Sequence, residues 1–199
     1  GAVLKTTHVE DFIIEPVSPI LWGYDFEDKK MVGLGNIDLI SKYPIGVVEE
    51  RVQKLKEEFP NKIVIGSITG SNKGTWQEPI RRLVAAGVDA IECACSCPQG
   101  HIGLEPGKSL LQDLVATSQM VKWAKEAVDQ AGGHFLNLNE AVAQKYEAMG
   151  KEKVAEFFPD DHTHTSHDGA KLNALTVAEL IEGLRQSELR DYIFIKKDE

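Results

Sequence analysis

The fold is decided by GVVEERVQKLKEEFPNKIVIGSITGSNKGTWQEPIRRLVAAGVDAIECACS, residues 46–96. Apolar residues recur at helical spacing over 46–60 and again over 76–88, and a short apolar run follows each of these segments, at 62–68 and 89–96. Helices that alternate with continuous apolar strands are typical of parallel βαβ units, because the helices cover the sheet. The pattern therefore predicts an α/β fold.

The alternation continues on both sides of this stretch. Residues 1–7, GAVLKTT, predict a buried strand that enters the fold without a preceding element. Residues 8–44 are rich in turn residues and predict a loop with a short hairpin. After residue 96 the pattern predicts three helices and two short runs that fit strands. The predicted helices cover 109–133, 140–150 and 170–187, the fourth strand covers 134–139, and an edge strand or packed tail covers 192–195.

Length and alternation together predict a single α/β domain over residues 1–199, with a small parallel sheet of about four to five strands flanked by helices. The sheet is expected to be either flavodoxin-like or half a barrel. In both folds, ligands gather beyond the carboxyl ends of the strands. A small molecule or an anion is therefore expected near Thr6 and Thr7, residues 67–74, 96–100 or 137–139. Exposed sheet edges also favour self-association.

Composition and charge limit the partners. The formal net charge of −9 argues against nucleic acid and anionic lipid. No apolar run is long enough to span a bilayer, and no export signal is seen, so a soluble protein without a membrane partner is expected. The cysteines are Cys93, Cys95 and Cys97, which is too close a spacing to cross-link distant segments. This spacing indicates a reducing, cytoplasmic setting.

The segment PDDHTHTS, residues 159–166, combines a histidine with nearby carboxylates. An aspartate that accepts a hydrogen bond from an imidazole fixes its tautomer and stabilises the imidazolium, so Asp161 and His164 are the candidate catalytic pair. Two alternatives remain open. The aspartates could cap a turn beside solvated histidines, or His162, His164 and His167 could bind a metal, although no fourth ligand is suggested.

This segment belongs to a longer stretch, about 123–184, that resembles the C-terminal part of the rhamnogalacturonan acetylesterases, a branch of the GDSL or SGNH hydrolases. In that family, which has a flavodoxin-like fold, the D-x-x-H block supplies the acid and the base of a catalytic triad. The resemblance gives these roles to Asp161 and His164. The family's nucleophilic serine stands in a G-D-S block, and this sequence contains no G-D-S.

The segment DAIECACSCPQG, residues 89–100, places cysteines along a predicted strand and at its carboxyl end. A thiol at a strand end can act as a general acid or a nucleophile if its pKa is tuned, and Cys97 has that position. Cys93 and Cys95 are expected to be small buried apolar side chains. Three cysteines on one strand diverge too far to bind one metal ion.

Four segments within the first 120 residues follow one another along the chain: GAVLKTT, GLGNIDLIS, IVIGSI and SCP. Together they resemble part of the flavin-binding barrel of the dihydroorotate and dihydropyrimidine dehydrogenases. In that family a lysine and a threonine contact the flavin, an asparagine faces the substrate, and the cysteine exchanges a proton with it. The resemblance gives these roles to Lys5, Thr6, Asn36 and Cys97.

The flavin site implied by this resemblance is incomplete. Ala94 stands where the family has an asparagine, and the hydrolase-like tail replaces the later barrel strands that cradle the flavin phosphate. No cofactor is therefore expected, and FMN is the cofactor that the resemblance implies. The glycine-rich turn GSITGSNKGTW, residues 66–76, could present amide groups to an anion or could simply be a flexible turn.

Two partial resemblances in one chain indicate a fold chimera, engineered or recombined, with the seam between Gln119 and Gly133. The first hypothesis is a folded scaffold without a complete active site, and therefore not an enzyme. The second is an ester hydrolase in which Asp161 and His164 activate a water or a nucleophile, with Ser67, Ser96 and Cys97 as candidates. The third is a flavin or phosphate binder.

Overall fold

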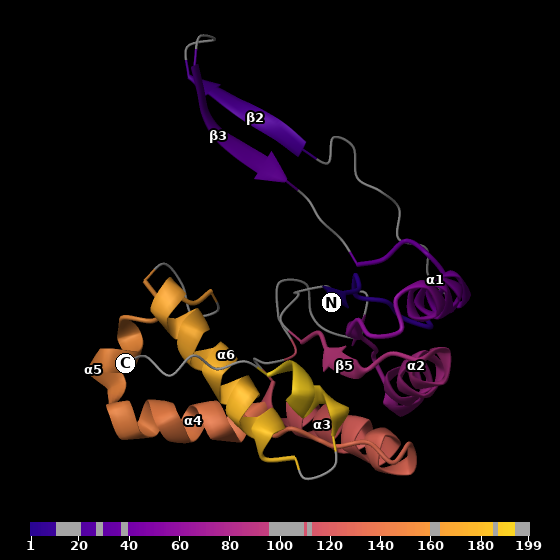
Figure 1. Ribbon diagram of the computed structural model, residues 1–199. Coiled ribbons are helices and arrows are strands. Elements are labelled where there is room, and N and C mark those ends of the chain that lie inside the picture. Colours follow the sequence, from indigo (N-terminus) through magenta and orange to yellow (C-terminus); the bar gives the residue numbers. More distant parts are fainter. Residues whose placement is uncertain are drawn as a thin grey trace. The chain divides into compact units, whose positions relative to one another are not determined.

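The computed structural model describes most of the chain (Figure 1). The described residues are 1–10, 21–26, 30–36, 40–95, 110, 113–159, 164–184 and 187–193. The chain divides into two compact units, Gly1–Ala131 and Gly132–Glu199. This boundary lies within the range 119–133 in which the sequence analysis places the seam. The expectation that the whole chain folds as one domain stays a prediction.

The first unit contains a parallel sheet of three described strands, β1 (Ala2–Val3), β4 (Val64–Ile68) and β5 (Ala90–Cys93), in the order β1-β4-β5. The α/β class and the small parallel sheet are thus confirmed, although the described strands are fewer than the four to five expected. The three parallel strands lie side by side in the same order as they follow one another along the chain. In the flavodoxin order the first strand would lie between the second and the third. The observed order therefore fits the half-barrel alternative.

The strand β1 is shorter and more exposed than the sequence predicts. Ala2 and Val3 pair with Val64 and Ile65, but Val3 is 58% exposed. The buried part of this segment lies further along the chain, where Thr7 forms a bridge to Ile68. The prediction of a buried strand over 1–7 is therefore correct for the pairing and wrong for the burial of its first residues.

Helices α1 (Ile45–Glu58) and α2 (Lys73–Ala86) carry the apolar faces predicted from the spacing. Helix α2 begins with a capping box, in which the Asn72 side chain accepts from the Thr75 amide and the Thr75 hydroxyl accepts from the Asn72 amide. It ends at Gly87, whose φ of 101° is a left-handed conformation that favours glycine. The buried core of the first unit comprises Val48, Val52, Val64, Ile68, Trp76, Ile80, Leu83, Ala86, Leu110, Met120, Ala124 and Ala127.

Helix α3 (Leu114–Gln130) packs against α2. Its first turn is capped by Asp113, which accepts from the Ala116 amide. The Gln77 side-chain amide donates to the Trp123 carbonyl, which ties the two helices together. Because Gln77 is buried, this bond satisfies a polar group that would otherwise destabilise the interface.

An ion pair links α1 to α2. Arg82 donates from Nε and Nη2 to the two Glu49 carboxylate oxygens at 2.7 and 2.6 Å. These hydrogen bonds lower the pKa of the Glu49 carboxyl. The pair is partly exposed, so solvent screens much of its energy.

Replacing Glu49 with glutamine is expected to lower the free energy of unfolding by less than about 1 kcal/mol at pH 7. Because the folded protein holds the pKa of Glu49 below its unfolded value of roughly 4.3, the stabilisation is present above that value. It is lost as the pH falls through the lower, folded value. Urea unfolding of both proteins at pH 7 and pH 3 should show a smaller difference at pH 3 than at pH 7. The exposed pair of Lys125 and Asp129 is the control, and Asp129→Asn should change little at either pH.

Strands β2 (Leu21–Phe26) and β3 (Lys30–Asn36) form the short hairpin that the sequence predicts. They pair antiparallel, with an irregularity in the register between Tyr24 and Asp25. The rings of Trp22 and Tyr24 meet edge to face at 6.0 Å. Asn36 lies opposite Leu21 in this pairing.

The second unit contains helices in its described residues: α4 (Leu138–Met149), α5 (Lys151–Ala155), α6 (His167–Glu182) and the 3-10 helix η3 (Glu188–Tyr192). Tyr146 on α4 contacts the rings of Phe157 and Phe158, and its hydroxyl donates to Asn173 on α6. The hydrogen bond links α4 to α6, and the ring contacts link α4 to the segment that follows α5.

The predicted fourth strand over 134–139 is wrong. Asn137 is instead the N-cap of α4, and its side chain accepts from the Glu140 amide. The asparagine side chain thus starts a helix where the short apolar run had suggested a strand. At the C-terminus, Tyr192 ends η3, and residues 194 and 195 of the predicted edge strand lie outside the described residues.

Candidate functional site

A row of polar side chains crosses the parallel sheet of the first unit near the carboxyl ends of its strands. The hydroxyl oxygens of Thr6 and Ser67 are 2.9 Å apart, and the Ser67 hydroxyl donates to a Glu92 carboxylate oxygen at 2.8 Å. Ser67 and Glu92 are directly paired in the register of β4 and β5. Glu92 is exposed, whereas Ser67 is 2% exposed. The row links a buried hydroxyl to a carboxylate at the surface.

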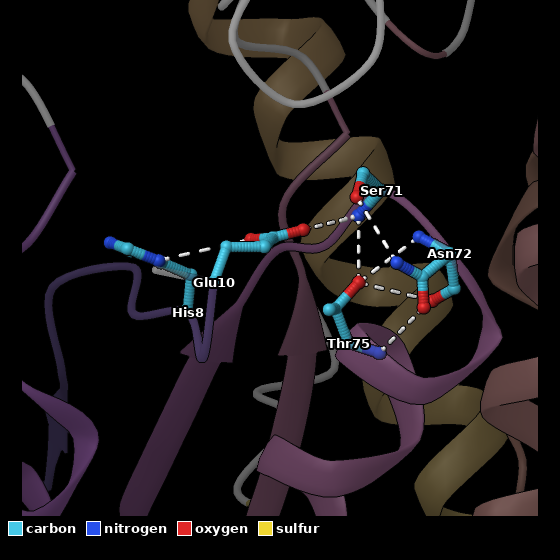
Figure 2. A network of polar contacts seen from close by, with 5 residues as sticks. All are labelled: His8, Glu10, Ser71, Asn72 and Thr75. Atoms are coloured by element: carbon cyan, nitrogen blue, oxygen red, sulfur yellow. Dashed lines mark hydrogen bonds and ion pairs between the residues drawn. The ribbon is translucent and has the colours of Figure 1, made fainter. Parts of the chain in front are cut away.

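A second polar cluster lies where the chain after β1 meets the first turn of α2 (Figure 2). The Ser71 amide donates to Glu10 Oε1 at 2.8 Å, and Glu10 Oε2 lies 3.8 Å from His8 Nδ1. The Thr75 hydroxyl accepts from the Ser71 and Asn72 amides. The amides of this glycine-rich turn therefore already have acceptors within the protein. An anion that bound the Ser71 amide would compete with Glu10.

The structure describes three of the four residues that the resemblance assigns to a flavin site, Lys5, Thr6 and Asn36. Lys5 is exposed, and the Thr6 hydroxyl is engaged with Ser67. Two carboxylates, Glu10 and Glu92, lie at the same strand ends, where they would repel the flavin phosphate. Asn36 belongs to the hairpin, and Cys97 lies outside the described residues.

Burial keeps the two described cysteines in the unreactive thiol form. Cys93 and Cys95 pack against the apolar core, and the Cys95 thiol donates to the Cys93 carbonyl. Burial raises the pKa of the Cys93 thiol to about 11 and that of Cys95 to about 12. Both thiols are therefore protonated at neutral pH, and the thiolate is the reactive form.

Alkylation of Cys93 and Cys95 by iodoacetamide at pH 7.5 is expected to be at least about tenfold slower in the folded protein than in urea. The reason is that unfolding removes the burial that raises their pKa values. Peptide mass spectrometry can measure each cysteine separately. Equal rates in the folded and unfolded protein would show that the strand end is open to solvent and that these thiols are available for chemistry.

The described part of the hydrolase-like motif lies just before α6 in the second unit. His164 precedes Ser166, whose side chain caps α6 by accepting from the Gly169 amide. Asp161 and His162 lie outside the described residues, as do Ser96 and Cys97, so the pairing of Asp161 with His164 stays a prediction. His167 Nδ1 lies 3.6 Å from Asp168 Oδ1, and the His167 side chain is 92% exposed. Within the ranges that the structure describes, no group of three histidine, cysteine or acidic residues could hold a metal ion.

Thr6 and Ser67 were predicted from the sequence and lie together in the structure, whereas Glu92, His8 and Glu10 were not predicted. Glu92 is the one acidic side chain in the apolar strand 90–93, and that exception to the pattern is a signal. His8 and Glu10 directly follow the polar end of the first predicted strand. Extending the carboxyl-end criterion by three residues would have included them.

Comparison with known proteins gives two partial similarities. No family model matches the chain. Its N-terminal half is similar to the NAD-dependent dihydropyrimidine dehydrogenase subunit PreA of Escherichia coli, with 38% identity over 99 residues, which are 50% of this chain and 24% of that protein. The chloroplastic dihydropyrimidine dehydrogenase (NADP(+)) of Arabidopsis thaliana is 35% identical over 94 residues, which are 47% of this chain and 22% of that protein.

A further 57 residues are 33% identical to the rhamnogalacturonan acetylesterase of Emericella nidulans, covering 29% of this chain and 23% of that protein. The chain thus spans about a quarter of the length of each relative it matches. The chain combines a dehydrogenase-like segment with an esterase-like segment, as the two resemblances predict. Among the described helices, none has the length and apolar character needed to cross a membrane.

Proposed function

We propose that this chain is a chimeric α/β scaffold, engineered from parts of two enzymes, in which neither parental active site is complete. The observation that supports the proposal most directly is the change of similarity within one chain. The dehydrogenase-like segment gives way to an esterase-like segment, and each matches about a quarter of its relative. An active site requires all its groups to be assembled, and a shared fold alone does not supply them.

The residues of each segment support the same conclusion. In the dehydrogenase-like segment, Thr6, Ser67 and Glu92 bond to one another, and the strand ends carry carboxylates that disfavour a flavin phosphate. In the esterase-like segment, Asp161 and His164 would supply an acid and a base, but the chain contains no G-D-S block to supply the serine. A general base without a nucleophile gives at most slow hydrolysis of activated esters.

The test is the hydrolysis of p-nitrophenyl acetate by the protein, by His164→Ala and by His167→Ala. His167 is a matched control because it lies on the same segment and is exposed to solvent, so its removal reports the background reactivity of a surface imidazole. The scaffold proposal expects equal rates for all three proteins, within about twofold. It also expects a colourless protein that does not quench the fluorescence of added FMN.

A second candidate is an ester hydrolase that uses Asp161 and His164. The similarity to a rhamnogalacturonan acetylesterase favours it. A positioned general base contributes about 100-fold to 10,000-fold. If His164→Ala lowers the rate at least about tenfold and His167→Ala does not, this candidate replaces the scaffold. The search for the nucleophile would then begin with Ser96 and Cys97, because Ser67 is buried and its hydroxyl is bound to Glu92.

A third candidate, a flavin or phosphate binder, has less support because two carboxylates, Glu10 and Glu92, lie near the strand ends. Quenching of FMN fluorescence by the purified protein would reverse this ranking. Substituting Lys5 would then be the first step, because Lys5 is the described basic side chain that follows β1.

A further inference from the structure

The chain immediately after β1 is tied to two other segments of the first unit. The Thr7 amide donates to the Ser67 carbonyl at 2.9 Å, and the Thr69 amide donates to the Thr7 carbonyl at 3.0 Å. Three residues later, Glu10 Oε1 accepts from the Ser71 amide at 2.8 Å. The first two bonds extend the sheet, whereas the third is made by a side chain that can gain or lose charge.

Glu10 and His8 are both largely withdrawn from water. The His8 side chain is 8% exposed and the Glu10 side chain is 14% exposed. A carboxylate in such a place is destabilising unless donors or positive charge compensate it. One oxygen of Glu10 accepts from the Ser71 amide at the N-terminus of α2, where the helix dipole also favours negative charge. The other oxygen faces His8 Nδ1 at 3.8 Å (Figure 2).

His8 can supply positive charge to Glu10, and other charged groups lie on the neighbouring elements. On α2, the Lys73 ammonium binds the Glu126 carboxylate of α3 at 2.8 Å. Lys5, on the chain that follows β1, is exposed. Protonated His8 would place a positive charge 3.8 Å from Glu10 Oε2. A histidine ordinarily exchanges its proton near pH 6.5.

We propose that His8 and Glu10 form a pH-dependent latch that holds the chain after β1 against the first turn of α2. While His8 holds its proton, the imidazolium faces the carboxylate, and the latch is closed. As the pH rises through the titration of His8, the folded state loses the positive charge, and the closed latch is weakened.

The position of the latch gives it a consequence for binding. It lies at the carboxyl ends of β1 and β4, where parallel α/β folds bind their ligands. When the latch opens, the Ser71 amide loses its bond to Glu10 and keeps only the one to the Thr75 hydroxyl, so its protection falls. The charge of His8 therefore sets how accessible this edge of the sheet is.

The test measures hydrogen exchange of the Ser71 amide by NMR, on the full chain, from pH 4 to pH 8. Dividing by the intrinsic exchange rate at each pH gives a protection factor that reports opening alone. The wild-type protection factor is expected to fall about tenfold between pH 5.5 and pH 8. In His8→Gln the fall between pH 5.5 and pH 8 should be absent.

Two controls keep the result specific. Glu126→Gln removes a carboxylate from the same helix junction without touching His8 or Glu10, and it should keep the wild-type pH profile. The Leu83 amide within α2 should stay protected throughout, which shows that the helix is folded. A Ser71 protection factor that is constant from pH 5.5 to pH 8 in the wild type would overturn the latch. So would a fall of the same size in His8→Gln.

Discussion

Trp76→Ala is expected to lower the free energy of unfolding by about 3–5 kcal/mol. Trp76 is 2% exposed on α2 and belongs to the core that α1, α2, α3 and the sheet share. Truncation removes the transfer free energy of the indole and leaves a cavity that its neighbours fill only in part. The loss is comparable to the whole stability of a marginal domain.

Urea unfolding followed by circular dichroism measures this loss without depending on tryptophan fluorescence. Val84→Ala is the matched control, because Val84 lies on the same helix and is 39% exposed. Its effect should stay within about 0.5 kcal/mol. Similar effects of the two substitutions would mean that α2 does not pack against the sheet in the way described.

Gly70→Ala is expected to lower the free energy of unfolding by about 1–3 kcal/mol. A Cβ at Gly70 would lie 2.7 Å from both the carbonyl carbon and the oxygen of Thr75. These are backbone atoms of the first turn of α2, so they move only if the start of the helix moves. Glycine is therefore required at position 70, because the chain that leaves β4 comes close to the backbone of α2 there.

Gly74→Ala, four residues later, is not expected to lower the free energy of unfolding. The nearest atom to a Cβ at Gly74 is Asn72 Oδ1, at 3.4 Å, and the residue lies inside α2. Alanine is favoured over glycine in a helix, so this variant should be neutral or more stable by up to about 1 kcal/mol. Thermal unfolding of Gly70→Ala and Gly74→Ala tests both expectations. Equal destabilisation would remove the argument that the Gly70 contact is special.

The parts of the fold that could be predicted are those in which a long periodic pattern coincides with packing. The spacing over 46–60 and 76–88 predicts α1 and α2 to within a few residues, because their apolar faces are the ones buried. The segment 134–139 failed because it is short, and a single side chain, Asn137, decided its structure by capping a helix. The exposure of Val3 also escaped prediction, since apolar character does not specify which strands have cover on both faces.

The site was predictable only where side chains follow the strand ends. Thr6 and Ser67 were found by that rule and contact each other. Glu10 reaches Ser71 across 61 residues, a contact that depends on the order of the strands in the sheet, which the sequence left open. Candidate residues that need two segments together, such as Asp161 with a nucleophile, stay predictions for the same reason.

The strand order also implies an order of assembly. Ser67 and Glu92, on β4 and β5, are 25 residues apart, whereas Thr6 joins Ser67 across 61 residues. Closing a chain loop costs roughly 0.6 kcal/mol more for each doubling of its length. The parallel β4-α2-β5 unit is therefore expected to form before β1 joins it.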